Sequence, residues 1–154
     1  MWEGADGSRY EGSYVNGQWQ GKGTYDAADG TRFEGTWMNG LLHGKGICSD
    51  ASGSYSGDWM HGERHGIGHL MRNNGEEYVG EWRHDDQTGA VEKAVIIAPD
   101  GAGGVYSGTF RQGLPNGKGK LIQEDGGCYE VCLHSLHTDE QPVLSTDSRQ
   151  KTRR

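Results

Sequence analysis

One pattern of aromatic and glycine residues returns five times along the chain and limits the folds available to it. Each unit opens with an aromatic residue, at positions 10, 33, 55, 78 and 106. Glycine always follows two residues later, a second aromatic residue four later, and another glycine eleven later. Seven and thirteen residues into the unit, glycine occurs in four units of five. Self-similarity with a period of roughly 20 to 50 residues indicates a repeat protein, in which each unit packs against its neighbours.

The spacing within one unit predicts a β-hairpin. Side chains alternate between the two faces of a strand, so Tyr10, Gly12 and Tyr14 share one face of a first strand. Asn16-Gly17 and Asn39-Gly40 are turn dipeptides that tolerate positive φ. A second strand follows, and Asp-Gly or Asn-Gly pairs then reverse the chain into the next unit. We therefore expect an all-β fold of antiparallel hairpins stacked on one another.

The core of such a chain has few aliphatic residues to draw on. Only 32% of the residues are hydrophobic, 28 of 154 are glycine, and the mean hydropathy is -0.85. A ring beside a glycine can lie flat over the bare backbone of the neighbouring strand and bury both groups. We therefore expect a thin core, one layer of rings deep, in which the rings compensate for the weak strand propensity of glycine.

The units resemble membrane occupation and recognition nexus repeats, the MORN family. The family pattern is Tyr-x-Gly-x-Trp, a turn glycine and then Gly-x-Gly, and YSGDWMHGERHGIG at residues 55–68 matches it. The resemblance covers residues 1 to about 134 and implies an elongated, twisted, single-layer sheet that forms a groove. It also implies a scaffold or targeting module without catalytic activity of its own.

The same resemblance divides the chain into three parts. Residues 1–9 would supply part of a leading repeat. Residues 10–134 would hold the five repeats and a capping strand that begins at Tyr129. Residues 135–154 are polar, lack aromatic residues and contain Pro142, so we expect a disordered tail.

The fourth unit departs from the pattern. It has Asp85 where the turn glycine belongs, Val91 where the second-strand glycine belongs, and five extra residues. Either the sheet bulges here or the longer hairpin protrudes, and protruding loops of repeat proteins often carry binding. A tolerated surface insertion is the alternative interpretation of residues 83–104.

No set of residues in the sequence is typical of a catalytic or cofactor site. A nucleophile needs a base and an orienting group in a dry pocket, which a single-layer sheet does not readily offer. Cys128, Cys132 and His134 would share a strand face, but no second half-site accompanies them, so a zinc centre is not expected. We expect a protein that is not an enzyme and that needs neither cofactor nor metal.

Binding of a partner polypeptide is the function that the pattern favours. The second aromatic residues of the units line one face of the predicted sheet: Tyr14, Trp37, Trp59, Trp82 and Phe110. Aromatic residues dominate both cores and binding hot spots, so two interpretations stand. Either this face grips a helical or extended segment of a partner, or the rings are purely core and partners attach to the ends or loops.

Apolar residues also fall where the hairpin turns are expected. They lie eight or nine residues into their units: Trp19, Leu41, Leu42 and Leu114. Polar residues are the norm in turns, so this placement suggests an apolar contact edge.

The charge distribution bears on the class of partner. The net charge is -7, and because the tail from residue 135 carries +1, residues 1–134 carry -8. That sign repels phosphate backbones and anionic lipid headgroups, so we expect no nucleic-acid partner and disfavour a membrane. Membrane association stays an alternative only through the basic residues of the tail: Arg149, Lys151, Arg153 and Arg154.

The location is inferred mainly from the resemblance. Family members are common in radial spokes, axonemes and the cortical cytoskeleton, so we expect an intracellular scaffold within a cytoskeletal or ciliary assembly. The alternatives are a membrane-targeting module and a structural or regulatory subunit of another large complex. The absence of a long apolar run, a signal peptide or a disulfide framework agrees with the inside of the cell. Edge strands at residues 4–9 and 129–134 would allow pairing with another copy or another protein.

Overall fold

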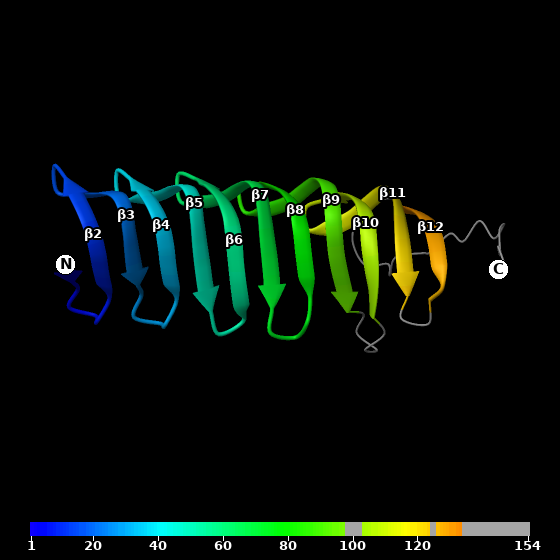
Figure 1. The fold of residues 1–154 in the computed structure, drawn as a ribbon, viewed down its shortest axis with the longest axis horizontal. Helices are drawn as coiled ribbons and strands as arrows, with labels where there is room; N and C mark the ends of the chain where they lie inside the picture. Colours follow the sequence, from blue (N-terminus) through cyan, green and yellow to red (C-terminus); the bar gives the residue numbers. More distant parts are fainter. Residues whose placement is uncertain (98–102, 124–125, 134–154) are drawn as a thin grey trace.

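The computed structural model describes residues 1–97, 103–123 and 126–133, which form one open antiparallel sheet. The strands are β1 (Trp2–Glu3), β2 (Arg9–Val15), β3 (Gln18–Asp26), β4 (Arg32–Met38), β5 (Leu41–Asp50), β6 (Gly53–Met60), β7 (Glu63–Arg72), β8 (Glu77–Arg83), β9 (Asp86–Ile97), β10 (Gly103–Arg111), β11 (Leu114–Gln123) and β12 (Cys128–Leu133). They follow one another in chain order across the sheet (Figure 1). The prediction of an all-β, single-layer sheet of stacked hairpins is confirmed. Within the described part of the chain, no helix has the length and apolar character needed to cross a bilayer.

Each unit is one hairpin, closed by a turn of two residues. Both turn residues have positive φ in every unit, as in Asn16 (50°) and Gly17 (77°). This turn geometry matches the right-handed twist of the flanking strands. The turns are therefore shorter than predicted. Trp19, Leu41, Leu42 and Leu114 were expected in turns, but they are the first or second residues of the second strands.

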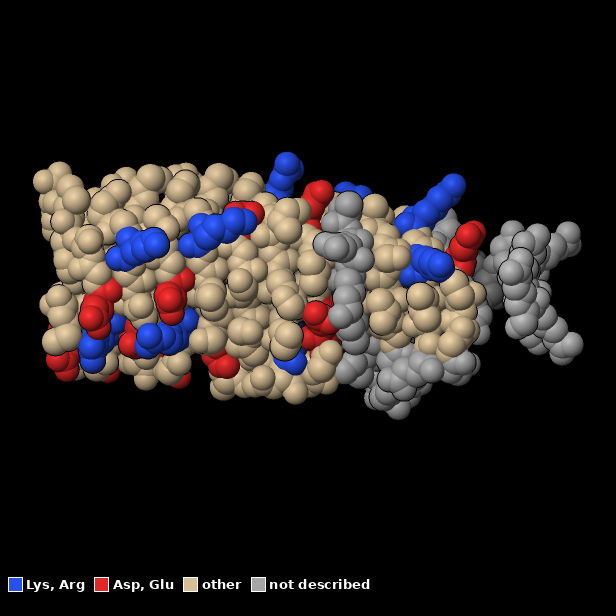
Figure 2. Space-filling model, in the orientation of Figure 1, with Lys and Arg blue, Asp and Glu red and all other residues tan. Residues whose placement is uncertain are grey.

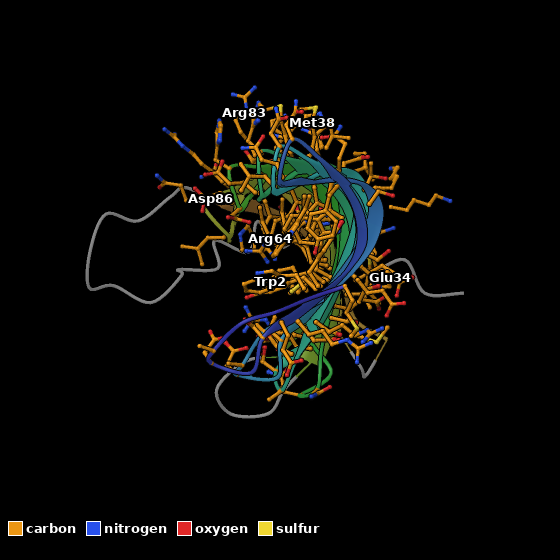
Figure 3. The ribbon with its side chains drawn as sticks, turned by 90° about the vertical axis from the view of Figure 1, so that its left-hand side faces the viewer. Trp2, Glu34, Met38, Arg64, Arg83 and Asp86 are labelled. Atoms are coloured by element: carbon orange, nitrogen blue, oxygen red, sulfur yellow. The ribbon has the colours of Figure 1, made fainter. Side chains whose placement is uncertain are left out.

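A bulge in each second strand bends the sheet. In the first hairpin Gly12 pairs with Gly23 and Ser13 pairs with Gln20, so Gly21 and Lys22 are extra residues in β3. Gly21 has a φ of 72°, and the corresponding glycine of each later unit also has positive φ. Bulges of this kind increase the local bend and twist of a strand. Viewed along its length, the sheet curls around a hollow into which Trp2 and Arg64 point, whereas Glu34 lies on the outside (Figure 3).

Rings laid over glycine pairs form the core. A Cβ atom added to Gly12 or Gly23 would collide with the ring of Tyr10, which is completely buried. The hydroxyl groups of the four tyrosines that open units donate to the carbonyl three residues on: Tyr10, Tyr55, Tyr78 and Tyr106. Burial disfavours the phenolate and raises the pKa of Tyr78 to about 12. The predicted ring-over-glycine core is thus present in the described sheet.

The second unit is built differently, because it opens with phenylalanine. Phe33 has no hydroxyl to donate, and it is only half-buried. Leu42 lies instead against the glycine pair of this unit, Gly35 and Gly46. Leu42 is 3% exposed, so its predicted place on an exposed turn is wrong. The two-residue turn is the reason, since it starts β5 early enough to direct this side chain onto the ring face.

The ends and the fourth unit show where the pattern changes. β1 pairs with β2 through Trp2 and Tyr10, as the last strand of a preceding unit would. In the fourth unit the register shifts near Gly80, where β9 carries an additional bulge. The sequence predicted either a bulge in the sheet or a protruding hairpin in this unit, and the bulge is present. Residues 98–102 and the tail from residue 134, with its four basic residues, lie outside the described residues.

Candidate functional site

The concave face carries a row of apolar side chains that are packed against the core but still partly open. We call this row the groove strip: Trp19, Tyr25, Phe33, Cys48 and Leu70. Tyr25 pairs with Phe33 across β3 and β4, and equivalent pairs continue the row along the sheet. Trp2, which is 43% exposed, packs edge-on against Trp19 with ring centroids 6.1 Å apart. The strip is therefore an apolar surface that faces the hollow.

The aromatic residues predicted to bind a partner lie mostly beneath this surface. Trp37, Trp59, Trp82 and Phe110 are 4%, 6%, 3% and 7% exposed. Each packs edge-on against a ring of an earlier strand; for example, the centroids of Tyr10 and Trp37 are 5.5 Å apart. Their burial supports the interpretation that these rings are core. A direct role in binding stays a prediction, and Tyr14, which is 39% exposed, is the member of the set with most open surface.

The predicted apolar edge is divided in the same way. Leu41 and Leu114 are exposed at the starts of β5 and β11. Trp19 and Leu42, one residue further along their strands, face the rings instead, and Trp19 stacks on Tyr10 with centroids 4.3 Å apart. Of the groove strip, only Trp19 was singled out from the sequence as a contact residue, and it was assigned to an apolar edge. The available signal was that Tyr25, Cys48 and Leu70 occupy equivalent second-strand positions on the glycine face.

A pocket of about 400 Å³ opens in the groove strip between the second and fourth units. Its apolar lining includes Phe33, Cys48 and Leu70, and polar groups such as Arg64 and Asp50 stand around it. Cys48 is a free cysteine where the first, third and fifth units have tyrosine or leucine, and its small side chain leaves room. Burial disfavours the thiolate and raises the pKa of the Cys48 thiol. The pocket can receive one large apolar side chain, and it falls in the usual size range of ligand sites, roughly 300 to 1,000 Å³.

One buried polar group beside this pocket is unpaired. The indole N–H of Trp37 donates to the carbonyl of Gly23 at 2.9 Å, and that of Trp82 donates to Gly68 at 3.3 Å. The indole nitrogen of Trp59, by contrast, is buried and has no hydrogen-bond partner among the described residues. Trp59 lies next to Gly46, the glycine that Leu42 covers. The irregular packing of the second unit thus accompanies the missing bond.

Carboxylates line the lip of the hollow that is formed by the connections between units. Asp6, Asp29 and Asp50 occupy equivalent connections, and we call them the acidic rim. Hydrogen bonds from the serine or threonine two residues on lower the pKa of all three carboxyl groups. The bond from the Ser52 hydroxyl to Asp50, for instance, is 2.6 Å long. These carboxylates therefore stay ionised at neutral pH and give the lip a negative charge.

The outer face has a different character. Over its N-terminal half, lysine and arginine side chains alternate with aspartate and glutamate (Figure 2). Several are paired within the chain, such as Lys45 with Asp58 at 2.7 Å and Arg9 with Glu11 at 3.1 Å. A shallow depression of about 820 Å³ here has glycine backbone in its floor. Because opposite charges alternate over this face, it favours no single sign of ligand.

The described residues contain no group of three histidine, cysteine, aspartate or glutamate side chains that could hold a metal ion. Of the three residues considered above for zinc, Cys128 is exposed, whereas His134 lies outside the described residues. The arrangement in the described sheet is therefore a surface suited to binding, with apolar contact in the groove and charge along one lip.

A comparison with protein families matches the same units. The model of the MORN repeat matches residues 10–32, 33–54, 55–77 and 106–128, which together make up more than half of the chain. Each match begins at the aromatic residue that opens a unit. The interval between the third and fourth matches holds the unit with the bulge near Gly80. The resemblance seen in the sequence is confirmed, and the chain belongs to the MORN repeat family.

Proposed function

We propose that this chain is a non-catalytic scaffold or adaptor whose concave face binds a segment of a partner polypeptide. MORN repeats generally mediate protein–protein or membrane interactions. The observation that carries the proposal is the groove strip, because it presents half-buried apolar side chains to a continuous hollow. Burial of this apolar surface against a partner would be favourable, because it removes the surface from water.

The spacing of the units limits the shape of the partner. Equivalent positions recur every second strand, about 9.5 Å apart at the usual strand separation. Two turns of an α-helix advance about 10.8 Å, and three residues of an extended chain advance about 10 Å. A helix with an apolar residue about every seventh position, or an extended segment with one about every third, would therefore follow the strip.

The acidic rim adds a requirement for charge. Asp6, Asp29 and Asp50 lie along one lip, so a segment with basic residues on the adjoining edge is favoured. The same rim repels anionic lipid headgroups, which supports a polypeptide partner over a membrane. We further propose that the partner belongs to a cytoskeletal or ciliary assembly inside the cell, on the basis of the family resemblance alone.

Two neighbouring residues on opposite faces of β5 provide the test. Cys48→Arg would fill the pocket of the groove strip with a long charged side chain, and Ile47→Arg would place the same side chain on the outer face, where Ile47 is exposed. Proximity labelling from tagged chains in their native cells would compare the two variants, after circular dichroism has confirmed that both are folded. Leu70→Asp serves as a second groove variant.

We expect the Ile47→Arg chain to label the same proteins as the wild type and the groove variants to lose them. Cytoskeletal or axonemal proteins among the lost partners would support the proposed assembly. The proposal fails if folded groove variants keep every partner. Labelling of membrane proteins that depends on Arg153 and Arg154 would support the tail-anchored alternative instead.

A further inference from the structure

We infer that Arg64 determines the specificity of this groove by binding a carboxylate of the partner segment. The inference rests on the proposed partner-binding function and adds the chemistry of one contact to it. Arg64 lies nine residues into the third unit, on β7, where it faces the rings. The other units have uncharged residues at this position: Trp19, Leu42, Gln87 and Pro115.

The guanidinium group of Arg64 lies over the ring of Trp82 and near that of Tyr55. Its central carbon lies 4.4 Å from the ring centroid of Trp82 and 5.6 Å from that of Tyr55. Arginine stacks on aromatic faces through cation–π attraction and contact between planar groups. These contacts restrict the positions open to the guanidinium group, so less conformational entropy is lost when a ligand binds to it.

Asp85 fixes the group from the side. It occupies the position of the turn glycine in the fourth unit and has a φ of 66°, a conformation that most non-glycine residues avoid. Its carboxylate accepts hydrogen bonds from the backbone N–H and the Nε of Arg64, both at 2.9 Å. Its carbonyl accepts a third from Nη2 at 3.1 Å. The departure from the repeat pattern at Asp85 therefore has a structural effect, because it positions Arg64.

These bonds leave hydrogen-bonding capacity on the guanidinium group. Arginine has five N–H donors, and the bonds to Asp85 use Nε and one donor of Nη2. The side chain is 28% exposed, lines the 400 Å³ pocket and points into the hollow (Figure 3). A planar fork of donors beside an apolar pocket is suited to a carboxylate next to an apolar side chain.

The position of Arg64 would also set the orientation of the segment. The acidic rim lies at the connections, whereas Arg64 is held by Asp85, a residue of a hairpin turn, and so stands toward the opposite lip. A complementary segment has basic residues along one edge and an acidic residue on the other. Because only the third unit has a cation at this position, binding of that acidic residue would fix the register of the segment along the groove.

The test uses the full chain and a display library of random 20-residue peptides. The tightest peptides are synthesised, and their dissociation constants are measured for the wild type, Arg64→Met and Arg83→Met. Methionine keeps an apolar stem over the rings and removes the charge. Arg83→Met is the matched control, because Arg83 is exposed on the outside of the sheet (Figure 3). Leu70→Asp, which places a negative charge in the same pocket, identifies which peptides bind in the groove.

We expect the groove-bound peptides to carry Asp or Glu and to bind Arg64→Met about tenfold or more weakly, with no change for Arg83→Met. Replacing the acidic residue of the peptide by its amide should weaken binding to the wild type equally and have no further effect on Arg64→Met. Arg64→Lys should recover part of the affinity. A purely structural Arg64 would not couple to one residue of the peptide.

Two results would overturn the inference in distinguishable ways. If groove-bound peptides bind the wild type and Arg64→Met equally, or lose affinity additively with the peptide change, Arg64 does not receive a carboxylate and the proposed function still stands. If no peptide binds in a manner sensitive to Leu70→Asp, the groove is not a peptide site. The proposed function then fails, and the inference fails with it.

Discussion

Replacing Trp59 by phenylalanine should destabilise the protein much less than the same replacement at Trp37. The two changes remove the same atoms. Because both rings are almost fully buried, they also leave cavities of similar size. The indole N–H of Trp37 donates to Gly23, whereas that of Trp59 has no partner among the described residues. Trp37→Phe therefore breaks a bond, while Trp59→Phe removes an unsatisfied donor from the core.

The difference can be estimated from the energies of these groups. A hydrogen bond contributes a net stabilisation of about 1 kcal/mol, and a buried donor without a partner costs about 1–3 kcal/mol. We expect Trp37→Phe to be less stable than Trp59→Phe by about 2–4 kcal/mol. With a denaturant slope of roughly 2 kcal/mol per molar urea, the unfolding midpoints would differ by about 1–2 M. Urea titrations followed by far-ultraviolet circular dichroism would measure this.

Trp82→Phe provides an internal replicate, because its indole N–H donates to Gly68 at 3.3 Å. It should resemble Trp37→Phe more than Trp59→Phe. Equal loss of stability in all three variants would refute the reasoning, because it would mean that the indole bonds make no measurable difference. A larger loss for Trp59→Phe would show that the indole of Trp59 has a partner in solution.

Three further experiments test the core and the pocket. Gly68→Ala would drive a Cβ atom into the ring of Tyr55, so we expect a loss of about 1–3 kcal/mol in urea unfolding, and a loss below about 0.5 kcal/mol would contradict the ring-over-glycine contact. Because burial raises the pKa of the Cys48 thiol, iodoacetamide should modify Cys48 more slowly than the exposed Cys128 at neutral pH. Peptide mass spectrometry would follow the modification of both residues, and faster modification of Cys48 would contradict this expectation. Burial also raises the pKa of the core tyrosines, so their contribution to stability is complete below about pH 10, the unfolded value, and is lost as the pH rises toward the folded values. Phenolate absorbance from these residues should then appear together with unfolding, and its appearance in a fully folded chain would be the contrary result.

The repeat pattern was sufficient to predict the hairpins, the single sheet and the rings over glycine. These features depend on spacing within one unit, as at Tyr10 and Gly12, and local spacing can be read from a sequence. The burial of Leu42 was missed because it depends on the exact length of a turn. Moving a strand start by one residue exchanges the two faces of the sheet.

The features of the candidate site that were missed depend on contacts between units. Asp85 was recognised as a departure from the pattern, but its bonds to Arg64 join residues 21 positions apart in the sequence. Trp59 is almost fully buried whereas Phe33 is half-buried, and this difference in burial likewise depends on how the sheet curls. Bulges in several strands produce that curl together, and no one unit specifies it.

The strict chain order of the strands has a mechanical consequence. Every strand is hydrogen-bonded only to the strands before and after it, so no bond in the described sheet ties distant units together. Tension applied at the two ends of the sheet would load one pair of strands at a time, beginning at an edge. The sheet should therefore unfold one strand at a time from an edge, at low and similar forces for successive strands. A segment bound along the groove would contact several units at once and would resist this stepwise unfolding.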